Sequence, residues 1–256
     1  MMLNRFRDHA SGILVIVLSL AVIELASRTG LVKATLIPPP TEVAKVLWAI
    51  LSSGQFMTPL SQTLAILFIS YVIACVLGIL LGVLMGYYHA IYCLLEPLVE
   101  ILRTIPKPIL LPPLMLLMGL GQPMKITIVA MAALFPVLIN TLQAVRAVDP
   151  TLIDTARTFG RGTASILWRV ILPSAAPMIL AGMRVSLGIG LVLVVLSEML
   201  AGTGGLGQVM MDMQNTFKVR ETFAWLAIIA VVGFSLAVLF DWLERRLTFW
   251  NAPNSQ

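Results

Sequence analysis

The sequence contains six long apolar runs, several of which reach the roughly 20 residues that a helix needs to cross a bilayer. A bilayer core holds no water to satisfy open backbone groups, so such runs are expected to be helices. Transmembrane strands would need short segments of alternating polarity, and none is evident. Only 11% of the residues are charged, against roughly 25% in soluble domains. The chain is therefore predicted to be an all-α, polytopic membrane protein.

The predicted spans form one transmembrane domain over residues 1–256. They lie near 11–27, 62–86, 98–119, 124–145, 174–200 and 223–243. The first run follows Arg5 and Arg7, as the apolar part of a signal peptide would. Its length, its Glu24 and the lack of a clear cleavage pattern favour an uncleaved span. Between the first two spans, Pro38–Pro40 interrupts regular structure, and Thr41 is expected to cap a surface helix.

The placement of Lys and Arg favours an orientation with both termini in the cytoplasm. This orientation also puts a turn at 87–97 and the segment 146–173 on the cytoplasmic side. The inner positions hold eight arginines, Arg5, Arg7, Arg146, Arg157, Arg161, Arg169, Arg245 and Arg246. A nucleic-acid-binding protein would instead carry a basic face on a soluble module, and the sequence offers no such module.

Two spans carry small residues on one helical stripe. Ala74, Gly78, Gly82 and Gly86 are spaced by four, and Gly182, Ser186 and Gly190 repeat the pattern. Because lipid gives little hydrophobic drive between helices, close backbone approach at such stripes holds them together. Packing within one chain is favoured here over a seam between two copies.

The span near 98–119 has four prolines within eight residues, including Pro106 and Pro113. Proline removes a backbone donor and clashes with the preceding turn, so this span is expected to be kinked or broken. Broken backbone at membrane depth is tolerated where protein or a water-filled path covers it. Pro106, Pro113 and Met115 are therefore candidates for lining a translocation path.

Arg184 and Glu198 are ionisable residues within one predicted span, and they complete the set of candidate path residues. They lie 14 positions apart, or about 21 Å along a helix, so they cannot pair with each other. Glu198 is near the outer end, where its side chain could equally reach the membrane interface. Arg184 is deeper and would suit an anionic solute.

Several familiar signals are weak or missing. Gly202–Gly207 matches the letters of a dinucleotide-binding loop, but it follows a membrane span rather than a strand, and a flexible outer turn is the preferred interpretation. The sequence has no P-loop and no catalytic constellation. Two Cys, Cys75 and Cys93, with two His do not make a typical metal site, so no metal or cofactor is expected in this chain.

The segment 146–173 is basic and patterned for helices. Asp149 and Pro150 favour a helix start, and Leu152, Ala156 and Phe159 would share one face. Gly160 and Gly162 allow a sharp turn, after which a second short helix is expected from about 163 to 172, stopped by Pro173. The expected product is a helix, turn and helix at the cytoplasmic surface.

This segment resembles the cytoplasmic loop of the permease subunits of binding-protein-dependent ABC importers. The family pattern is E-A-A, three residues, Gly, nine residues and I-x-L-P. This chain has Asp154, Thr155, Ala156, Gly160, Val170, Leu172 and Pro173 at that spacing, with Asp and Thr as mild departures. Further segments, among them Ile105–Pro106, Gly119–Gly121, Ser197–Leu200 and Gly204–Gly207, are similar to the nitrate, sulfonate, taurine and bicarbonate branch.

The resemblance implies a type I ABC importer permease in a bacterial inner membrane. It implies a second permease copy, two ABC ATPases that bind ATP and magnesium, and an extracytoplasmic solute-binding protein. The ATPase-docking residues would be Asp154, Thr155, Ala156, Arg157, Gly160, Arg161, Leu172 and Pro173. The chain itself would not be an enzyme, and its solute would be a small anion.

Two other functions stay open. An ion-gradient secondary transporter is usually built of repeats with central charges, and the sequence shows no convincing repeat. A permease for a heterocyclic vitamin precursor fits the same branch. The sequence does not identify the solute, nor decide between a homodimer and a heterodimer.

Overall fold

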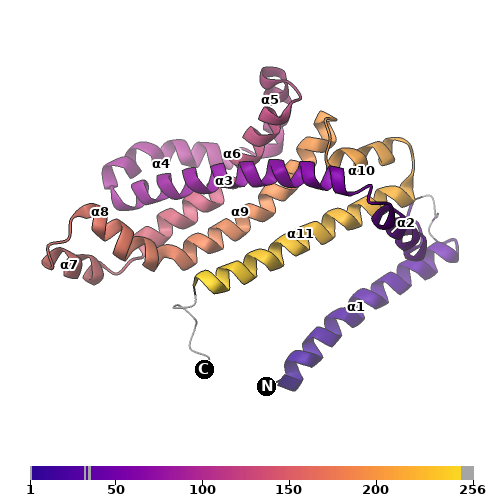
Figure 1. Cartoon of the computed structure of the whole chain (residues 1–256), viewed down its shortest axis with the longest axis horizontal. Coiled ribbons are helices and arrows are strands. Elements are labelled where there is room, and N and C mark those ends of the chain that lie inside the picture. Colours follow the sequence, from indigo (N-terminus) through magenta and orange to yellow (C-terminus); the bar gives the residue numbers. More distant parts are fainter. Residues whose placement is uncertain (1, 32, 34–35, 249–256) are drawn as a thin grey trace.

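The computed structural model describes residues 2–31, 33 and 36–248, and all of the regular secondary structure there is helical (Figure 1). The first half contains α1 (Met2–Arg28), α2 (Pro40–Ser53), α3 (Met57–Tyr87), α4 (His89–Thr104), the 3-10 helix η1 (Lys107–Leu110), α5 (Leu111–Met118) and α6 (Gln122–Arg146). The second half contains α7 (Pro150–Thr158), α8 (Thr163–Ile166), the π-helical turn η2 (Leu167–Ile171), α9 (Leu172–Ala201), α10 (Leu206–Asn215) and α11 (Val219–Leu247).

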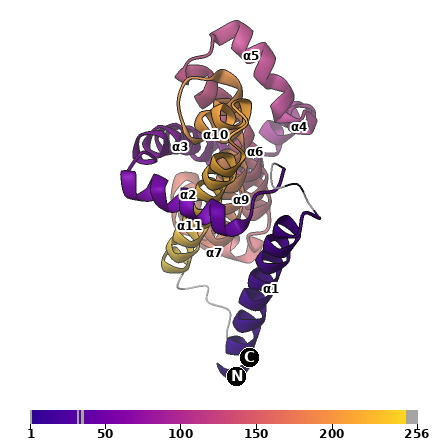
Figure 2. The same cartoon turned by 90° about the vertical axis from the view of Figure 1, so that its right-hand side faces the viewer.

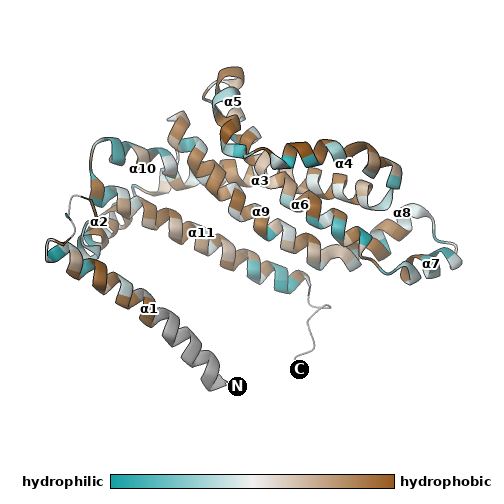
Figure 3. Cartoon of the chain, turned by 180° about the vertical axis from the view of Figure 1, so that it is seen from behind, coloured by the Kyte–Doolittle hydropathy of each residue, from teal (hydrophilic) through white to brown (hydrophobic). Residues whose placement is uncertain are grey.

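Four helical stretches in the described residues are long and apolar enough to cross a bilayer: α3, α6, the continuous run Thr163–Ala201 and α11. The bent pair formed by α4 and by η1 with α5 gives a fifth if it counts as one span. Helix α1 contains residues 11–27, where the first span is predicted. Figure 3 shows apolar residues along the long helices, with polar residues gathered on α7, α10 and the end of α11.

The centre of the bundle is a close stack of three helices, with α6 between α3 and α9. The stripe of α3 meets every fourth residue of α6. A Cβ at Gly78 would lie 2.9 Å from the Val137 Cβ, and a Cβ at Gly82 would lie 2.6 Å from the Thr141 Cβ. On α9, the Ser186 hydroxyl donates to the Ala133 carbonyl at 2.6 Å. The prediction that these stripes pack within one chain is confirmed.

The prolines break the third span at Ile105–Pro106, where the two halves turn by 87°. The predicted kink is therefore confirmed. Lys107 follows the break, and its ammonium donates to the carbonyls of Leu102 at 2.6 Å and Ile105 at 2.9 Å. This side chain satisfies backbone acceptors that the lost helical turn leaves open.

Three local expectations were wrong. The predicted turn at 87–97 is mostly helix, because α4 begins at His89 and tolerates Pro97. Thr41 does not cap α2. That helix begins one residue earlier, and the Thr41 backbone N–H donates instead to Glu24 of α1, at 3.0 Å. Pro173 does not end a helix, because the π-helical turn before it leads directly into α9.

Helix α1 touches the rest of the structure mainly through α2, and it runs apart from the other long helices (Figures 1 and 2). The amphipathic α2 packs across α10 and α11 through a cluster that includes Ile50, Leu206, Trp225 and Ile228. The helix expected between the first two spans is therefore present, and its apolar face includes the buried Ile50. It buries that face against the end of the bundle that carries α10.

Candidate functional site

The segment 146–173 forms a small platform at one end of the bundle, built from α7, α8 and η2 (Figure 1). It is mounted on α6 and α9 by a buried apolar cluster. The cluster contains Ala144, Val145, Val148, Ile166, Ile171, Ala175 and Ile179. Because the platform shares this core with two long helices, a force on it is passed to both.

The first helix of the platform starts as the sequence predicts. The Asp149 carboxylate accepts a hydrogen bond from the Thr151 backbone N–H at 2.8 Å, and Pro150 occupies the first turn. This bond stabilises the ionised carboxylate and holds the pKa of Asp149 below its ordinary value. A lowered pKa means that the cap is intact at neutral pH and is lost as the pH falls through the shifted value.

Acidification is expected to loosen α7 through this cap. Hydrogen exchange measured by mass spectrometry should show falling protection of the 150–158 amides as the pH is lowered from 7 to about 3, below the ordinary aspartate pKa. Asp149→Asn is the matched control, because asparagine caps as well but does not titrate in this range. An equal loss of protection in the Asn variant would contradict this assignment.

The turn after α7 depends on Gly160. Its φ is +69°, its N–H donates to the Arg157 carbonyl at 2.9 Å, and a Cβ there would meet no atom within 4 Å. Glycine is therefore favoured for its backbone conformation, not for lack of space. Gly162, by contrast, has an ordinary negative φ.

An open cleft of about 520 Å³ lies between the short helices of the platform. Its lining combines apolar side chains with arginines: Leu152, Thr155, Ala156, Phe159, Arg161, Ser165, Ile166, Arg169 and Val170. Phe159 lies at the edge of the cleft and is 79% exposed. Trp168, nine residues later in η2, is 73% exposed. The expectation that Leu152, Ala156 and Phe159 share one face is confirmed. Such a cleft can receive an apolar side chain with an acidic neighbour.

The predicted docking residues are largely gathered on this platform. Thr155, Ala156 and Arg161 line the cleft, and Gly160 makes its turn. Asp154 and Arg157 are exposed and form an ion pair at 3.2 Å. Leu172 packs half-buried against the supporting cluster, and Pro173 is exposed at the start of α9.

The predicted path residues are scattered. Pro106 and Pro113 are exposed, and Met115 packs half-buried against the cluster shared by α3, α6 and α9. Arg184 forms ion pairs with Asp241 and Glu244 of α11. The separation of Arg184 from Glu198 is confirmed, since each takes different partners. A role of these residues in the path stays a prediction.

Glu198 does not reach toward the membrane interface, because its side chain is fully buried. It accepts hydrogen bonds from the Thr63 hydroxyl and from the Gly207 N–H, at 2.9 Å and 3.0 Å. The residues Gly202–Gly207 are therefore not the flexible turn expected from the sequence. Lys125, which the sequence reasoning did not single out, is also fully buried here. The only feature of the sequence that could have indicated this burial is the position of Lys125 inside an apolar run.

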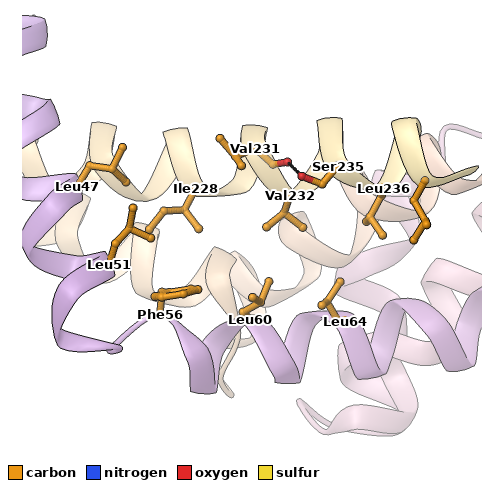
Figure 4. Close-up of a pocket in the computed structure, with 11 residues that line it drawn as sticks. Leu47, Leu51, Phe56, Leu60, Leu64, Ile228, Val231, Val232, Ser235 and Leu236 are labelled. Carbon is orange, nitrogen blue, oxygen red and sulfur yellow. Dashed lines mark hydrogen bonds between the residues drawn. The ribbon is translucent and has the colours of Figure 1, made fainter.

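A second cleft, of about 380 Å³, lies between α2, α3 and α11 (Figure 4). Apolar side chains line it, and its one polar side chain, Ser235, donates its hydroxyl to the Val231 carbonyl at 2.7 Å. Nothing in it can recognise a polar solute. Across the described residues, no three potential ligands from His, Cys, Asp or Glu gather as a metal site.

Residues 74–249 match the family described as the inner membrane component of binding-protein-dependent transport systems. The match covers α6, the platform and α9 together. The chain belongs to this family. Members of this permease family with curated descriptions include a putative aliphatic sulfonates transport permease protein, SsuC of Bacillus subtilis, 31% identical over 93% of this chain and 87% of that protein.

Other relatives in the permease family are similarly close over most of their length. The taurine transport system permease protein TauC of Escherichia coli is 32% identical, over 86% of this chain and 82% of that protein. The riboflavin transport system permease protein RibX of Chloroflexus aurantiacus is 32% identical, over 98% of this chain and 94% of that protein. The chain is thus a permease subunit of the ABC importer type.

Two solved structures support the fold. The MetNI methionine ABC transporter, in an inward-facing conformation, matches with a TM-score of 0.63 at 24% identity, over 73% of this chain and 93% of the other. A bacterial ABC transporter for import of the acidic polysaccharide alginate matches with a TM-score of 0.62 at 17% identity, over 96% and 99%. The expected type I importer permease fold is confirmed.

Proposed function

We propose that this chain forms the translocation path of an ATP-driven importer for a small sulfonate or a related anion. The observation that supports this most strongly is the 146–173 platform. It is preorganised, carries a cleft with exposed aromatic and basic edges, and is joined to α6 and α9 by one apolar core. The sulfonate and taurine permeases among the relatives support the solute class.

The proposed assembly has two copies of this chain, two cytoplasmic ABC ATPases and an extracytoplasmic solute-binding protein. The platform faces the cytoplasm, and both termini lie on that side, in agreement with the distribution of basic residues. ATP and magnesium bind to the ATPases, which alone are catalytic. Closure of the ATPase pair moves the platforms and opens the path outward, and hydrolysis resets it.

Solute selection in this proposal belongs mainly to the binding protein. The cleft between α2, α3 and α11 is apolar, the cleft of the platform is open, and Arg184 is already paired with two carboxylates. A path that releases solute quickly needs only weak sites. An anion is thus expected to meet Arg184 only after that ion-pair network rearranges.

A second candidate solute is a heterocyclic vitamin or its precursor. The riboflavin permease among the relatives supports it, at an identity similar to that of the sulfonate and taurine permeases. The two candidates share the assembly and differ only in the binding protein's ligand.

The decisive experiment is reconstitution of the chain with its partner ATPase and its solute-binding protein. Vesicles loaded with ATP should take up labelled taurine or an alkyl sulfonate, and riboflavin serves as the competing solute. An ATPase variant that binds but does not hydrolyse ATP is the control. Uptake that persists with this variant and follows an imposed ion gradient would refute the ATP-driven mechanism and favour a secondary transporter.

A further inference from the structure

Side chains accept hydrogen bonds from the backbone N–H groups at the N-terminus of α10, some from distant parts of the chain and one from the first turn of α10 itself. The first four N–H groups of a helix have no partner within the helix. Here each of the four successive N–H groups around the start of α10 finds a side-chain oxygen. The Gly204 N–H donates to Gln208, the Gly205 N–H to Gln62, the Leu206 N–H to Thr63 and the Gly207 N–H to Glu198.

Two opposite charges fasten the turn that leads into this helix. The Lys125 ammonium donates to the Gly204 carbonyl at 3.1 Å, and the Glu198 carboxylate accepts from the Gly207 N–H at 3.0 Å. Both side chains have 0% exposure. A carboxylate is stabilised by the positive end of a helix dipole, and a buried carboxylate needs such donors. The chain therefore supplies its own anion to the α10 N-terminus.

The glycines of this turn bring its backbone against α9. A Cβ at Gly205, whose φ is +103°, would overlap the Glu198 carboxylate, and a Cβ at Gly207 would overlap the Val195 carbonyl. The turn thus sits directly on the last turns of α9. The Thr63 hydroxyl adds α3 to the same contact, because it donates to Glu198 and accepts from the Leu206 N–H at 2.9 Å.

Helix α9 connects this contact to the platform at the other end of the bundle (Figure 1). Its 30 residues span about 45 Å at the usual helical rise. Just after the C-terminal end of α10 lies a residue with an uncommon backbone conformation. Phe217 has a positive φ of +56° and is 88% exposed. A non-glycine residue held in this conformation is strained, and strain of this kind is concentrated at functional sites.

We propose that Glu198 is a positioning residue for transport. Together with Lys125 it fixes α10 to the outer end of α9. Because α9 also supports the platform, α10 and the platform then move together as one rigid unit. Helix α10 and Phe217 then form the outer surface that signals the presence of a loaded binding protein to the ATPases. This inference rests on the proposed function, and it assigns the positioning role to side chains that are fully buried.

The test is ATP hydrolysis by the reconstituted complex, measured with and without loaded binding protein. Glu198→Ala should lower the ratio of stimulated to basal hydrolysis by about tenfold or more, the effect of losing one hydrogen bond to a charged group. Glu198→Gln keeps the volume and one acceptor, and is expected to restore part of the stimulation. Acetate should also restore part of it in Glu198→Ala, by filling the vacated carboxylate position.

Thr63→Val provides an independent variant, since it keeps the side-chain shape but removes the hydroxyl that links Glu198 to Leu206. Thr63→Val should lower the stimulation ratio as Glu198→Ala does. If Glu198→Ala fails to assemble, Thr63→Val alone tests the positioning role. Glu100→Ala is the matched control, because Glu100 is an exposed carboxylate paired with Arg103 on α4. Its stimulation ratio should equal that of the wild type.

The outcomes separate the two proposals. A wild-type complex that hydrolyses ATP without any response to loaded binding protein would overturn the proposed function, and this inference with it. A responsive wild type, together with full stimulation in Glu198→Ala or Thr63→Val, would overturn the positioning role alone. Loss of stimulation in Glu198→Ala that neither glutamine nor acetate relieves would also count against it, because general misfolding would then explain the loss.

Discussion

Gly82→Leu is expected to prevent formation of the folded bundle. A Cβ at this position would already lie 2.6 Å from the Thr141 Cβ and 2.8 Å from the Leu138 carbonyl oxygen. The second contact is with backbone, which cannot rotate away as a side chain can. A leucine must therefore push α3 away from α6 along their main interface, and overpacking without relief of this kind is among the few changes that cost more than about 4 kcal/mol.

The measurement is size-exclusion chromatography and thermal unfolding of the purified chain in detergent. Gly82→Leu should yield aggregate or no protein. Alanine gives a finer comparison, since the change from glycine in a helix normally stabilises by about 1 kcal/mol. Gly82→Ala should unfold at lower temperature than the wild type. Gly188→Ala, at a helical position with no atom within 4 Å of its Cβ, should be neutral or stabilising.

If Gly82→Ala and Gly188→Ala shift the unfolding temperature equally, the close packing of α3 on α6 is not what stabilises the bundle. The test is direct because the two glycines differ mainly in their surroundings. Both lie within long helices, and neither has a positive φ.

Gly160→Val is expected to disrupt assembly with the ATPase while leaving the bundle folded. A β-branched residue is strongly disfavoured at a φ of +69°, at a cost of about 1–3 kcal/mol. The supporting cluster lies beneath the turn and is untouched, so the strain should distort the edge of the cleft rather than the spans. The expected loss of ATPase affinity is about tenfold to a hundredfold for that free energy.

Co-purification with the ATPase, titrated at several concentrations, measures this loss. Gly162→Val is the matched control, because it adds the same side chain two residues away at a φ of −73° with no atom within 4 Å. Gly160→Asn should retain more affinity than Gly160→Val, since asparagine tolerates the left-handed conformation. Equal affinity for the wild type and Gly160→Val would show that the turn does not shape the docking surface.

The parts of the fold that sequence reasoning predicted well are those set by local rules. The cap at Asp149, the sharp turn at Gly160 and the broken span at Pro106 each depend on a few neighbouring residues. The stripe of Gly78, Gly82 and Gly86 could be predicted because its period is that of the helix itself. The platform was therefore recognisable before any tertiary contact was known.

The missed features depend on contacts between distant parts of the chain. The Thr63 and Glu198 side chains meet across 135 positions, and Lys125 meets Gly204 across 79. Periodicity carries no information about such pairs, so the sequence left an interfacial position open for Glu198 and predicted a flexible glycine turn. In the same way, the π-helical turn that leads into α9 before Pro173 has no local sequence signal.

The close fit of α3 to α6 and of α9 to α6 restricts where a solute path can open. Helices that interlock through glycines and backbone carbonyls cannot slide or rotate against each other without collision. The three must keep their mutual geometry through a transport cycle. In the proposed transport cycle, the changes in shape that expose the path to one side and then the other are therefore expected in α4 before the break, in α5 after it, in the loosely packed α1, and at the contact of α11 with α9.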